Sequence, residues 1–222
     1  MKKFICIALA VVIYQGLFAQ SFVTTKADAT TFPIASSGTA SIYVEETDDW
    51  LANKAATLLQ TDIETVTGKK PVIIHDLSGG SKNVIIIGTS TGSLLIKKLA
   101  GQKKLDLSAL TGKWEAFQLR TLSKPVPGVD KALVITGSDK RGTAYGVLEL
   151  SKQLGVSPWY WWADVPAKKK ETVFIKDGVY NYASPSVKYR GIFINDEAPA
   201  FSGWTKEKFG GVNHLVYEKM FE

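Results

Sequence analysis

Between residues 41 and 155, short apolar runs alternate with segments whose apolar residues recur at helical spacing. We expect strands at SIYVEE (41–46), PVIIH (71–75), NVIIIG (83–88), residues 113–122 and KALVITG (131–137). We expect helices at residues 51–66, SLLIKKLAG (93–101) and RGTAYGVLELSKQLG (141–155). Strands and helices that alternate along a chain pack in layers, so the sequence predicts an α/β sandwich.

Capping residues indicate where the predicted helices begin and end. Thr47, Asp48 and Asp49 offer an N-cap and acidic residues for the first long helix, and Gly68 offers its C-terminal stop. Gly155 ends the last helix, whose inward-facing residues are expected to be Val147, Leu150 and Leu154. The runs at 71–75 and 83–88 are almost wholly apolar, which indicates strands covered on both faces. Residues 22–40, rich in Thr, Ser and Ala, are expected to form an irregular lead-in.

The first 20 residues have the order of a secretory signal peptide. Lys2 and Lys3 precede an apolar stretch, and the small residue Ala19 comes before Gln20 at the expected cleavage point. A membrane anchor is the alternative, but the apolar run of about 15 residues is shorter than the ~20 that span a bilayer. We therefore expect a periplasmic or secreted protein. Cys6 lies inside this segment, so the mature chain would have no disulfide and no thiol nucleophile.

The charge balance is modestly basic. Loss of Lys2 and Lys3 with the signal peptide lowers the formal net charge of +6 by two, to +4. The one dense run, Lys168 to Lys170, is interpreted as a solvated loop rather than a nucleic-acid or membrane surface. We expect no nucleic-acid partner, and no membrane contact once the signal peptide is removed.

Familiar cofactor and hydrolase motifs are absent. Gly88 and Gly92 lie between a strand and a helix, but no Gly-Lys-Ser/Thr follows and the three-glycine dinucleotide fingerprint is missing. His75 and His214 have no partner spaced for metal binding, and no nucleophile elbow supplies a serine. The sequence therefore predicts a plain turn at Gly88, structural histidines and no cofactor.

The segment GSDKRGTAYG (137–146) is expected to be structural as well. Ser138 or Asp139 can cap the helix that follows, and glycines in its first turns permit close packing. Arg141 is the residue here with functional potential, and an ion pair is the expected role.

An aromatic block follows the last predicted helix of this region. SPWYWWADVP (157–166) places three Trp and one Tyr in Trp159 to Trp162. The block either packs a connecting segment against a neighbouring domain or lines a sugar-contacting surface. Residues 172–187 then read as a strand, an Asp-Gly turn and a linker.

From Val187 the pattern becomes strand, loop and helix. An apolar run from Gly191 to Ile194 leads into Asn195, Asp196 and Glu197, and residues 204–222 lead into a helix with His214 near its start. Neighbouring side chains of a strand point to opposite faces, so Asp196 and Glu197 are not expected to act as an acid/base pair. A carboxylate at the C-terminal end of a barrel strand is a common catalytic position. A loop-forming or helix-capping role is the alternative.

Four segments together resemble the N-terminal part of glycoside hydrolase family 115, the xylan α-glucuronidases. They are GSDKRGTAYG, SPWYWWADVP, KYRGIFINDEAP and SGWTKEKFGGVNH, in this order along the chain. The resemblance implies that residues 21–185 form an α/β accessory domain. It further implies that residues 186–222 begin a catalytic (β/α)8 TIM barrel, which would be truncated here.

The resemblance also implies an activity, which is removal of α-1,2-linked glucuronic acid or its 4-O-methyl ether from xylan with inversion. Asp196 would be catalytic, while Asn195 and Glu197 would bind the sugar. Inversion needs a second carboxylic acid, roughly 6.5–9.5 Å from the first. That acid would come from later barrel strands, so the chain alone is expected to be inactive. The expected partner is glucuronoxylan or its oligosaccharides, and the sequence leaves the oligomeric state of the full-length enzyme open.

Two other functions remain open from the sequence. One is a different polysaccharide-active barrel glycosidase that shares the accessory domain, although the FINDEAP segment argues against it. The other is a non-catalytic carbohydrate-binding or interaction module that uses the aromatic block from Trp159 to Trp162.

Overall fold

The structure is a computed structural model that describes residues 21–221. The predicted signal peptide, with Cys6 and the Ala19–Gln20 bond, lies outside the described residues. The chain divides into two compact units, one reaching to Pro185 and the other starting at Ser186. Across residues 21–221, every helix is too short or too polar to cross a bilayer.

A six-stranded mixed sheet is the centre of the first unit. Its strands are β3 (Ser41–Val44), β4 (Ile73–Ile74), β5 (Asn83–Thr89), β6 (Phe117–Ser123), β7 (Lys131–Gly137) and β9 (Val179–Tyr182). Their order is β4-β3-β5-β7-β6-β9. Strands β4, β3, β5 and β7 run parallel to one another, and β6 is antiparallel to both of its neighbours, β7 and β9. This sheet brings the carboxyl ends of β3, β5 and β7 to one edge.

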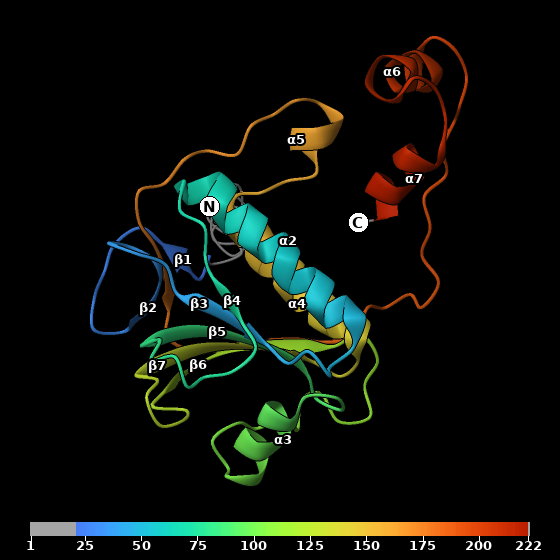
Figure 1. Cartoon of the computed structure of the whole chain (residues 1–222). Coiled ribbons are helices and arrows are strands. Elements are labelled where there is room, and N and C mark those ends of the chain that lie inside the picture. The colour runs from blue at the N-terminus through green and yellow to red at the C-terminus, as the bar shows by residue number, and fades with distance from the viewer. Residues whose placement is uncertain (1–20, 222) are drawn as a thin grey trace, which may run out of the picture. The chain divides into compact units, whose positions relative to one another are not determined.

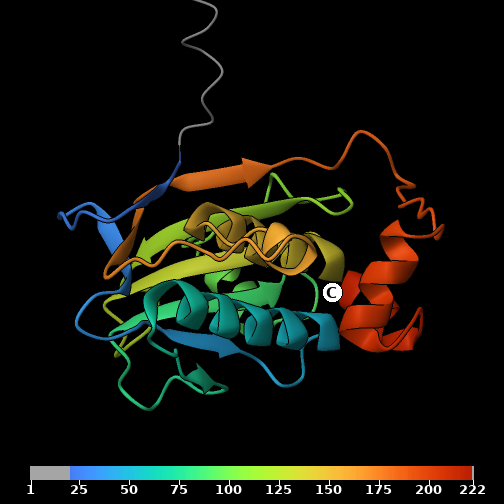
Figure 2. The ribbon, with the colours of Figure 1, turned by 90° about the horizontal axis from the view of Figure 1, so that it is seen from above.

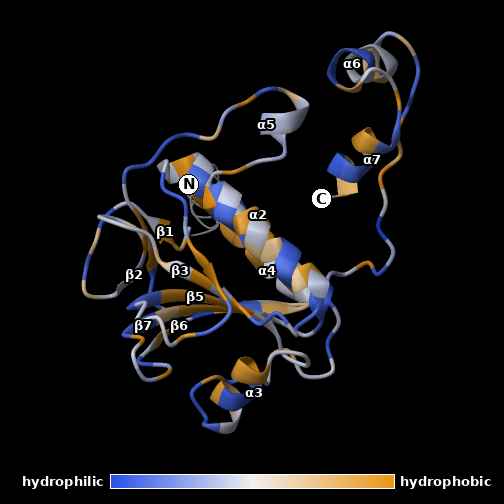
Figure 3. Cartoon of the chain, in the orientation of Figure 1, coloured by the Kyte–Doolittle hydropathy of each residue, from blue (hydrophilic) through white to orange (hydrophobic). Residues whose placement is uncertain are grey.

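Helices cover both faces of this sheet. Helices α2 (Trp50–Thr67) and α4 (Lys140–Leu154) lie side by side on one face, and α3 (Leu94–Gly101) lies on the other (Figures 1 and 2). Residues of β5 alternate between two cores, with Ile85 and Ile87 in the core that α2 and α4 share, and Ile86 in the core beneath α3. In Figure 3 the strands are largely hydrophobic, whereas α2 alternates between hydrophobic and hydrophilic residues. The predicted α/β class is confirmed.

Helix boundaries follow the capping residues. Asp49 accepts a hydrogen bond from the Leu51 N–H at the start of α2, and Gly68 closes that helix with φ 71°. Asp139 caps α4 in the same way, and Gly155 ends it with φ 99°. A left-handed residue is open to glycine without the steric cost that a side chain incurs, so both stops are encoded locally.

The expectation of an irregular lead-in at residues 22–40 is wrong. Strands β1 (Val23–Thr24) and β2 (Thr31–Ala35) flank β8 (Val173–Lys176) in a three-stranded antiparallel sheet. Phe32 and Ile34 of β2 are fully buried and join the core beneath α2 and α4. The many Thr and Ser residues of this segment hid a strand whose partner lies far away in the sequence.

Two edges of the main sheet also differ from expectation. The predicted buried strand at 71–75 is reduced to the two residues of β4 at the sheet edge, and Val72 is 62% exposed. After β8 the segment expected to be a linker begins with a strand, β9. The chain moves here to the other sheet, where β9 pairs with β6. An edge strand needs only one partner, so a few half-buried residues are enough to form it.

The lysine run 168–170, interpreted as a solvated loop, also makes hydrogen bonds to two helices. The Lys169 and Lys170 ammonium groups donate to the carbonyls of Thr65 and Leu154, in the last turns of α2 and α4. Cations at helix C-termini are favoured by the unpaired carbonyls there. The aromatic block itself forms one helical turn, α5 (Trp159–Trp162).

The second unit contains two helices, α6 (Ala200–Phe209) and α7 (His214–Phe221). Gly210 and Gly211, with φ of 76° and 147°, separate the two helices. The strand expected at residues 187–196 is not formed. A strand is held by hydrogen bonds to a neighbouring strand, and the described part of this unit contains none.

Candidate active site

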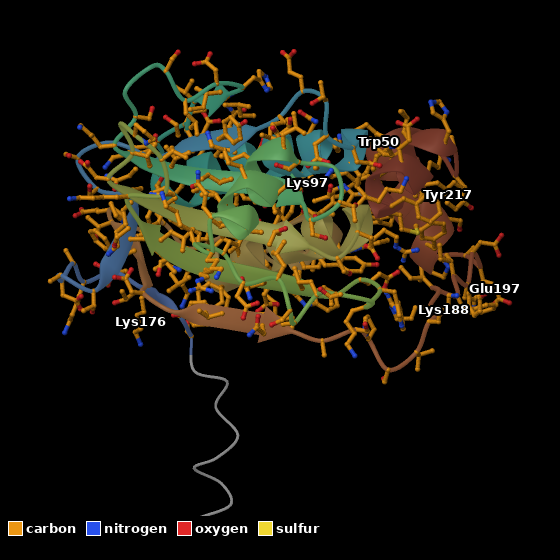
Figure 4. The ribbon with its side chains drawn as sticks, turned by 90° about the horizontal axis from the view of Figure 1, so that it is seen from below. Trp50, Lys97, Lys176, Lys188, Glu197 and Tyr217 are labelled. Atoms are coloured by element: carbon orange, nitrogen blue, oxygen red, sulfur yellow. The ribbon has the colours of Figure 1, made fainter. Side chains whose placement is uncertain are left out.

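The predicted site residues lie in an exposed connection that leads to α6. Ile192 is 72% and Phe193 93% exposed, and the three polar residues that follow are exposed as well. Asn195 Oδ1 accepts a hydrogen bond from the Glu197 N–H at 3.2 Å. Such a side-chain-to-backbone bond two residues on is an Asx turn, which Asn favours. Figure 4 shows the Glu197 side chain directed away from the ribbon.

This turn changes the relation between the two carboxylates. In a strand Asp196 and Glu197 would lie on opposite faces, but the structure has a turn at this point. The structure brings Asn195 and Glu197 together and leaves Asp196 in solvent beside them. The roles assigned to the three residues therefore stay predictions. Among residues 21–221, no three His, Cys, Asp or Glu side chains are grouped to hold a metal ion.

The carboxyl edge of the parallel strands is the other place where an α/β fold commonly binds ligands. After β5, the Thr89 N–H and hydroxyl both donate to the carboxylate of Asp48, at 2.7 Å each. A Cβ atom added to Gly92 would lie 2.2 Å from Asp48 Oδ1. The chain's own carboxylate therefore accepts the hydrogen bonds of these donors, as a plain structural turn requires.

A second polar cluster follows β7. Asp139 accepts from the Gly142 N–H at 2.8 Å and from the Glu115 N–H at 2.7 Å. The buried carboxylate of Glu115 lies 3.0 Å from Arg141 Nε, and Arg141 also donates to the Tyr145 hydroxyl at 2.9 Å. Arg141 therefore makes the structural ion pair that the sequence suggested.

The two histidines have structural surroundings. His75 Nδ1 is 2.8 Å from the Val44 carbonyl oxygen, and its Nε2 is 3.9 Å from a carboxylate oxygen of Glu46. His214 is the first residue of α7. Sequence reasoning missed the link between Asp48 and Thr89, although the glycine at position 92 was a signal that the turn is tightly packed.

The chain is similar to a known protein family and to solved structures. The model of glycosyl hydrolase family 115 matches residues 182–222. The solved structure of BtGH115A, a family GH115 4-O-methyl-α-glucuronidase with specificity for decorated arabinogalactans, is 36% identical with a TM-score of 0.69. The match covers 86% of this chain and 24% of that structure, so this chain spans about a quarter of its relative.

More distant structures match over a similar range. A GH20 β-N-acetylhexosaminidase from Streptomyces coelicolor is 13% identical with a TM-score of 0.42, covering 76% of this chain and 26% of that one. No curated protein sequence matches the chain. The family model covers the last two of the four segments noted in the sequence, and the structural match to a member of the same family covers 86% of the chain. The chain belongs to glycosyl hydrolase family 115.

Proposed function

We propose that this chain is the amino-terminal part of an exported glycoside hydrolase that removes glucuronic acid, or its 4-O-methyl ether, from a polysaccharide. The observation that carries the proposal is the 36% identity to a 4-O-methyl-α-glucuronidase over 86% of this chain. Because this chain spans only 24% of that relative, the activity is assigned to a protein that also contains the remaining barrel units. Export rests on the first 20 residues, and amino-terminal sequencing of the mature protein should begin at Gln20.

In this proposal residues 21–185 are the accessory domain and residues 186–222 open the catalytic (β/α)8 barrel. The apolar residues before the Asx turn support the second assignment, because Ile192 and Phe193 expose most of their surface. In a barrel, the packed interior on one face of the strand and the outer helices on the other would cover such side chains. Asn195 and Asp196 would then stand at the end of the first strand, facing the sugar.

The chemistry follows from the residue types at that position. Asp196 orients the attacking water and accepts its proton, while Asn195 and Glu197 hydrogen-bond to the sugar. An inverting mechanism requires a second carboxylic acid roughly 6.5–9.5 Å away, which protonates the leaving oxygen. Basic groups that hold the glucuronate carboxylate are required as well. Both come from later strands of the barrel, so residues 21–222 alone should release no sugar.

Two polysaccharide backbones fit the proposal. The resemblance that the sequence carries suggests xylan, whereas the similar solved enzyme has specificity for decorated arabinogalactans. Both polymers should therefore be offered to the enzyme. The shared requirement is an α-linked, uronic acid side group.

The experiment is an assay of the protein made from the complete reading frame. Glucuronoxylan and decorated arabinogalactan are incubated separately, and the first-formed product is followed by proton NMR. The proposal predicts that 4-O-methylglucuronic acid appears first as the β-anomer, because inversion converts an α-linkage to a β-product. Absence of release from both polymers would overturn the proposal, and an α-anomer formed first would overturn inversion.

A second function is favoured by the exposure of the aromatic block. Trp159 is 62% and Tyr160 44% exposed. Large exposed aromatic side chains commonly mark binding surfaces. As a non-catalytic module, residues 21–185 would bind glucuronoxylan through this block. Loss of polymer binding in Trp159→Ala, together with no sugar release by the complete protein, would favour this function over the enzyme.

A further inference from the structure

Four lysines collect on the side of the main sheet that α3 covers. Lys97 and Lys98 lie on α3, Lys103 lies in the turn after it, and Lys124 lies in the turn between β6 and β7. All four are exposed. Figure 4 looks onto this side of the unit, where Lys97 lies over the centre of the ribbon. We call these four residues the basic face.

One further lysine holds the two turns together. Lys104 Nζ donates to the Pro125 carbonyl at 2.7 Å and lies 3.5 Å from the Lys124 carbonyl oxygen. This contact places Lys103, which precedes Lys104, near Lys124 of the other turn. The basic face is therefore assembled from two segments by a specific tertiary contact, and it does not arise only from lysines that are adjacent in sequence.

The positive charge of this face is poorly balanced. Residues 94–105 contain four lysines and no acidic residue. Within residues 21–221, none of the four lysines of the basic face forms an ion pair with another side chain. The nearby carboxylate in sequence is Asp106, whose pKa is lowered mainly by hydrogen bonds from Ser108. Asp130, in the same turn as Lys124, lies 3.8 Å from the ammonium group of Lys82. These two carboxylates leave an excess of cations, which attracts an anionic polymer.

The backbone gives an independent sign that these side chains have a role. Lys103 and Lys124 have φ of 58° and 48°, in the left-handed region that disfavours residues with a Cβ. Glycine would fit both turns with less strain, yet both positions carry a long cationic side chain. Backbone strain that persists at two neighbouring turns points to a function of the residues that bear it.

We infer that the basic face binds acidic polysaccharide, that is, a chain bearing uronic acid carboxylates. The inference rests on the proposed function, whose substrate carries glucuronate groups and is therefore anionic. Lysine ammonium groups contact carboxylates as flexible point charges, so they can hold a polymer without fixing its register. The face would raise the local concentration of polymer near the enzyme and favour long substrates over short ones.

The test measures retention of this chain by polymers in native affinity gels. The polymers are glucuronoxylan and the same glucuronoxylan after chemical reduction of its carboxyl groups. The double variant Lys97→Gln/Lys124→Gln is compared with the control Lys26→Gln/Lys168→Gln, which removes equal charge from exposed sites elsewhere. Retention by the acidic polymer should weaken about fivefold in the first variant and change less than about twofold in the control. It should also weaken as salt is added.

A glycine variant separates binding from packing. Lys124→Gly relieves the left-handed backbone, so its melting temperature should equal or exceed that of the unmodified chain while retention falls. A purely structural lysine would not show this combination. In the complete protein, Lys97→Gln/Lys124→Gln should slow release from polymer and leave release from a short acidic oligosaccharide unchanged.

Four results would overturn the inference. They are equal retention of the double variant and its control, equal retention by the reduced polymer, tighter binding to duplex DNA than to glucuronoxylan, and unchanged retention of Lys124→Gly. Failure of the proposed function looks different, because the complete protein would then release no sugar from polymer or oligosaccharide. Retention that depends on the basic face would stand in that case.

Discussion

The carboxylate of Asp48 accepts two hydrogen bonds of 2.7 Å from one residue, the Thr89 N–H and the Thr89 hydroxyl. It also accepts from the Asp49 N–H at 2.8 Å. Asp48 ends the loop after β3, and Thr89 ends β5, so this contact ties together the carboxyl ends of two parallel strands. The Gly92 N–H donates to the Thr89 hydroxyl oxygen at 2.7 Å, which extends the network into the turn before α3.

Asp48→Asn should therefore destabilise the first unit. The amide keeps the shape of the side chain but replaces a charged acceptor oxygen by a donor that faces other donors. A loss of about 2 kcal/mol in the free energy of unfolding is expected. Urea unfolding followed by circular dichroism measures it. Asp106→Asn, at an exposed carboxylate, is the control and should change little, and an equal change in both variants would remove Asp48 from this role.

Gly142→Ala should be destabilising for a steric reason. A Cβ at Gly142 would lie 2.4 Å from the Ala116 carbonyl oxygen, and a backbone atom cannot move aside cheaply. Overpacking of this kind costs about 2 kcal/mol in unfolding free energy. Gly101→Ala is the matched control, because its Cβ meets no atom within 4 Å and it also lies in a helix. Thermal unfolding that is equally affected in both variants would contradict the close packing of α4.

Stability should fall at alkaline pH in a way that depends on Tyr43. Burial, then the negative charges of Glu45 and Asp76, raises the pKa of Tyr43 to about 12. The unfolded chain releases this proton near the ordinary pKa of about 10. Between these values the folded state binds more protons than the unfolded state, so stability decreases as pH rises. Below pH 10 both states are protonated and the effect vanishes.

Tyr43→Phe removes this titrating group. Its free energy of unfolding should decline less steeply between pH 10 and 12 than that of the unmodified protein, as measured by urea unfolding at several pH values. Some decline should remain, because the pKa of Tyr182 is also raised to about 12. Identical slopes for the two proteins would contradict the account.

The sequence predicted those elements whose signals are local. Asp49, Asp139, Gly68 and Gly155 act through backbone groups within a few residues, so the ends of α2 and α4 can be read directly. The apolar runs of β5 and β7 identify central strands, because a strand buried on both faces has few polar residues. These features fix the layers of the first unit.

The missed elements depend on partners that are remote in sequence. Phe32 pairs with Ile175 across the small sheet, and nothing near Phe32 indicates that partner. The segment from Gly191 to Ile194 shows the reverse case. It has the composition of a buried strand, yet it lies exposed in a unit whose described residues offer no strand to pair with. Composition indicates what a segment can form, and a partner decides whether it forms.

The candidate site was predicted in part. The sequence predicted the polar residues from Asn195 to Glu197 and their place after an apolar run. Side-chain parity in a strand predicted that Asp196 and Glu197 do not act as an acid/base pair, and the Asx turn at Asn195 is a local feature that parity did not include. The proposed role of Asp196 depends on a second carboxylic acid and on basic groups from later barrel strands. It is therefore tested by measuring sugar release by the complete protein.

The most direct test of the account is the rate at which the complete protein and its Asp196→Asn variant release 4-O-methylglucuronic acid. We expect a fall in kcat of about a thousandfold, because a general base of this kind supplies a factor of roughly 10²–10⁴ in rate. The melting temperature should be unchanged, since Asp196 is exposed in the second unit. An unaltered kcat in Asp196→Asn would contradict the central claim that this chain contributes a catalytic carboxylate.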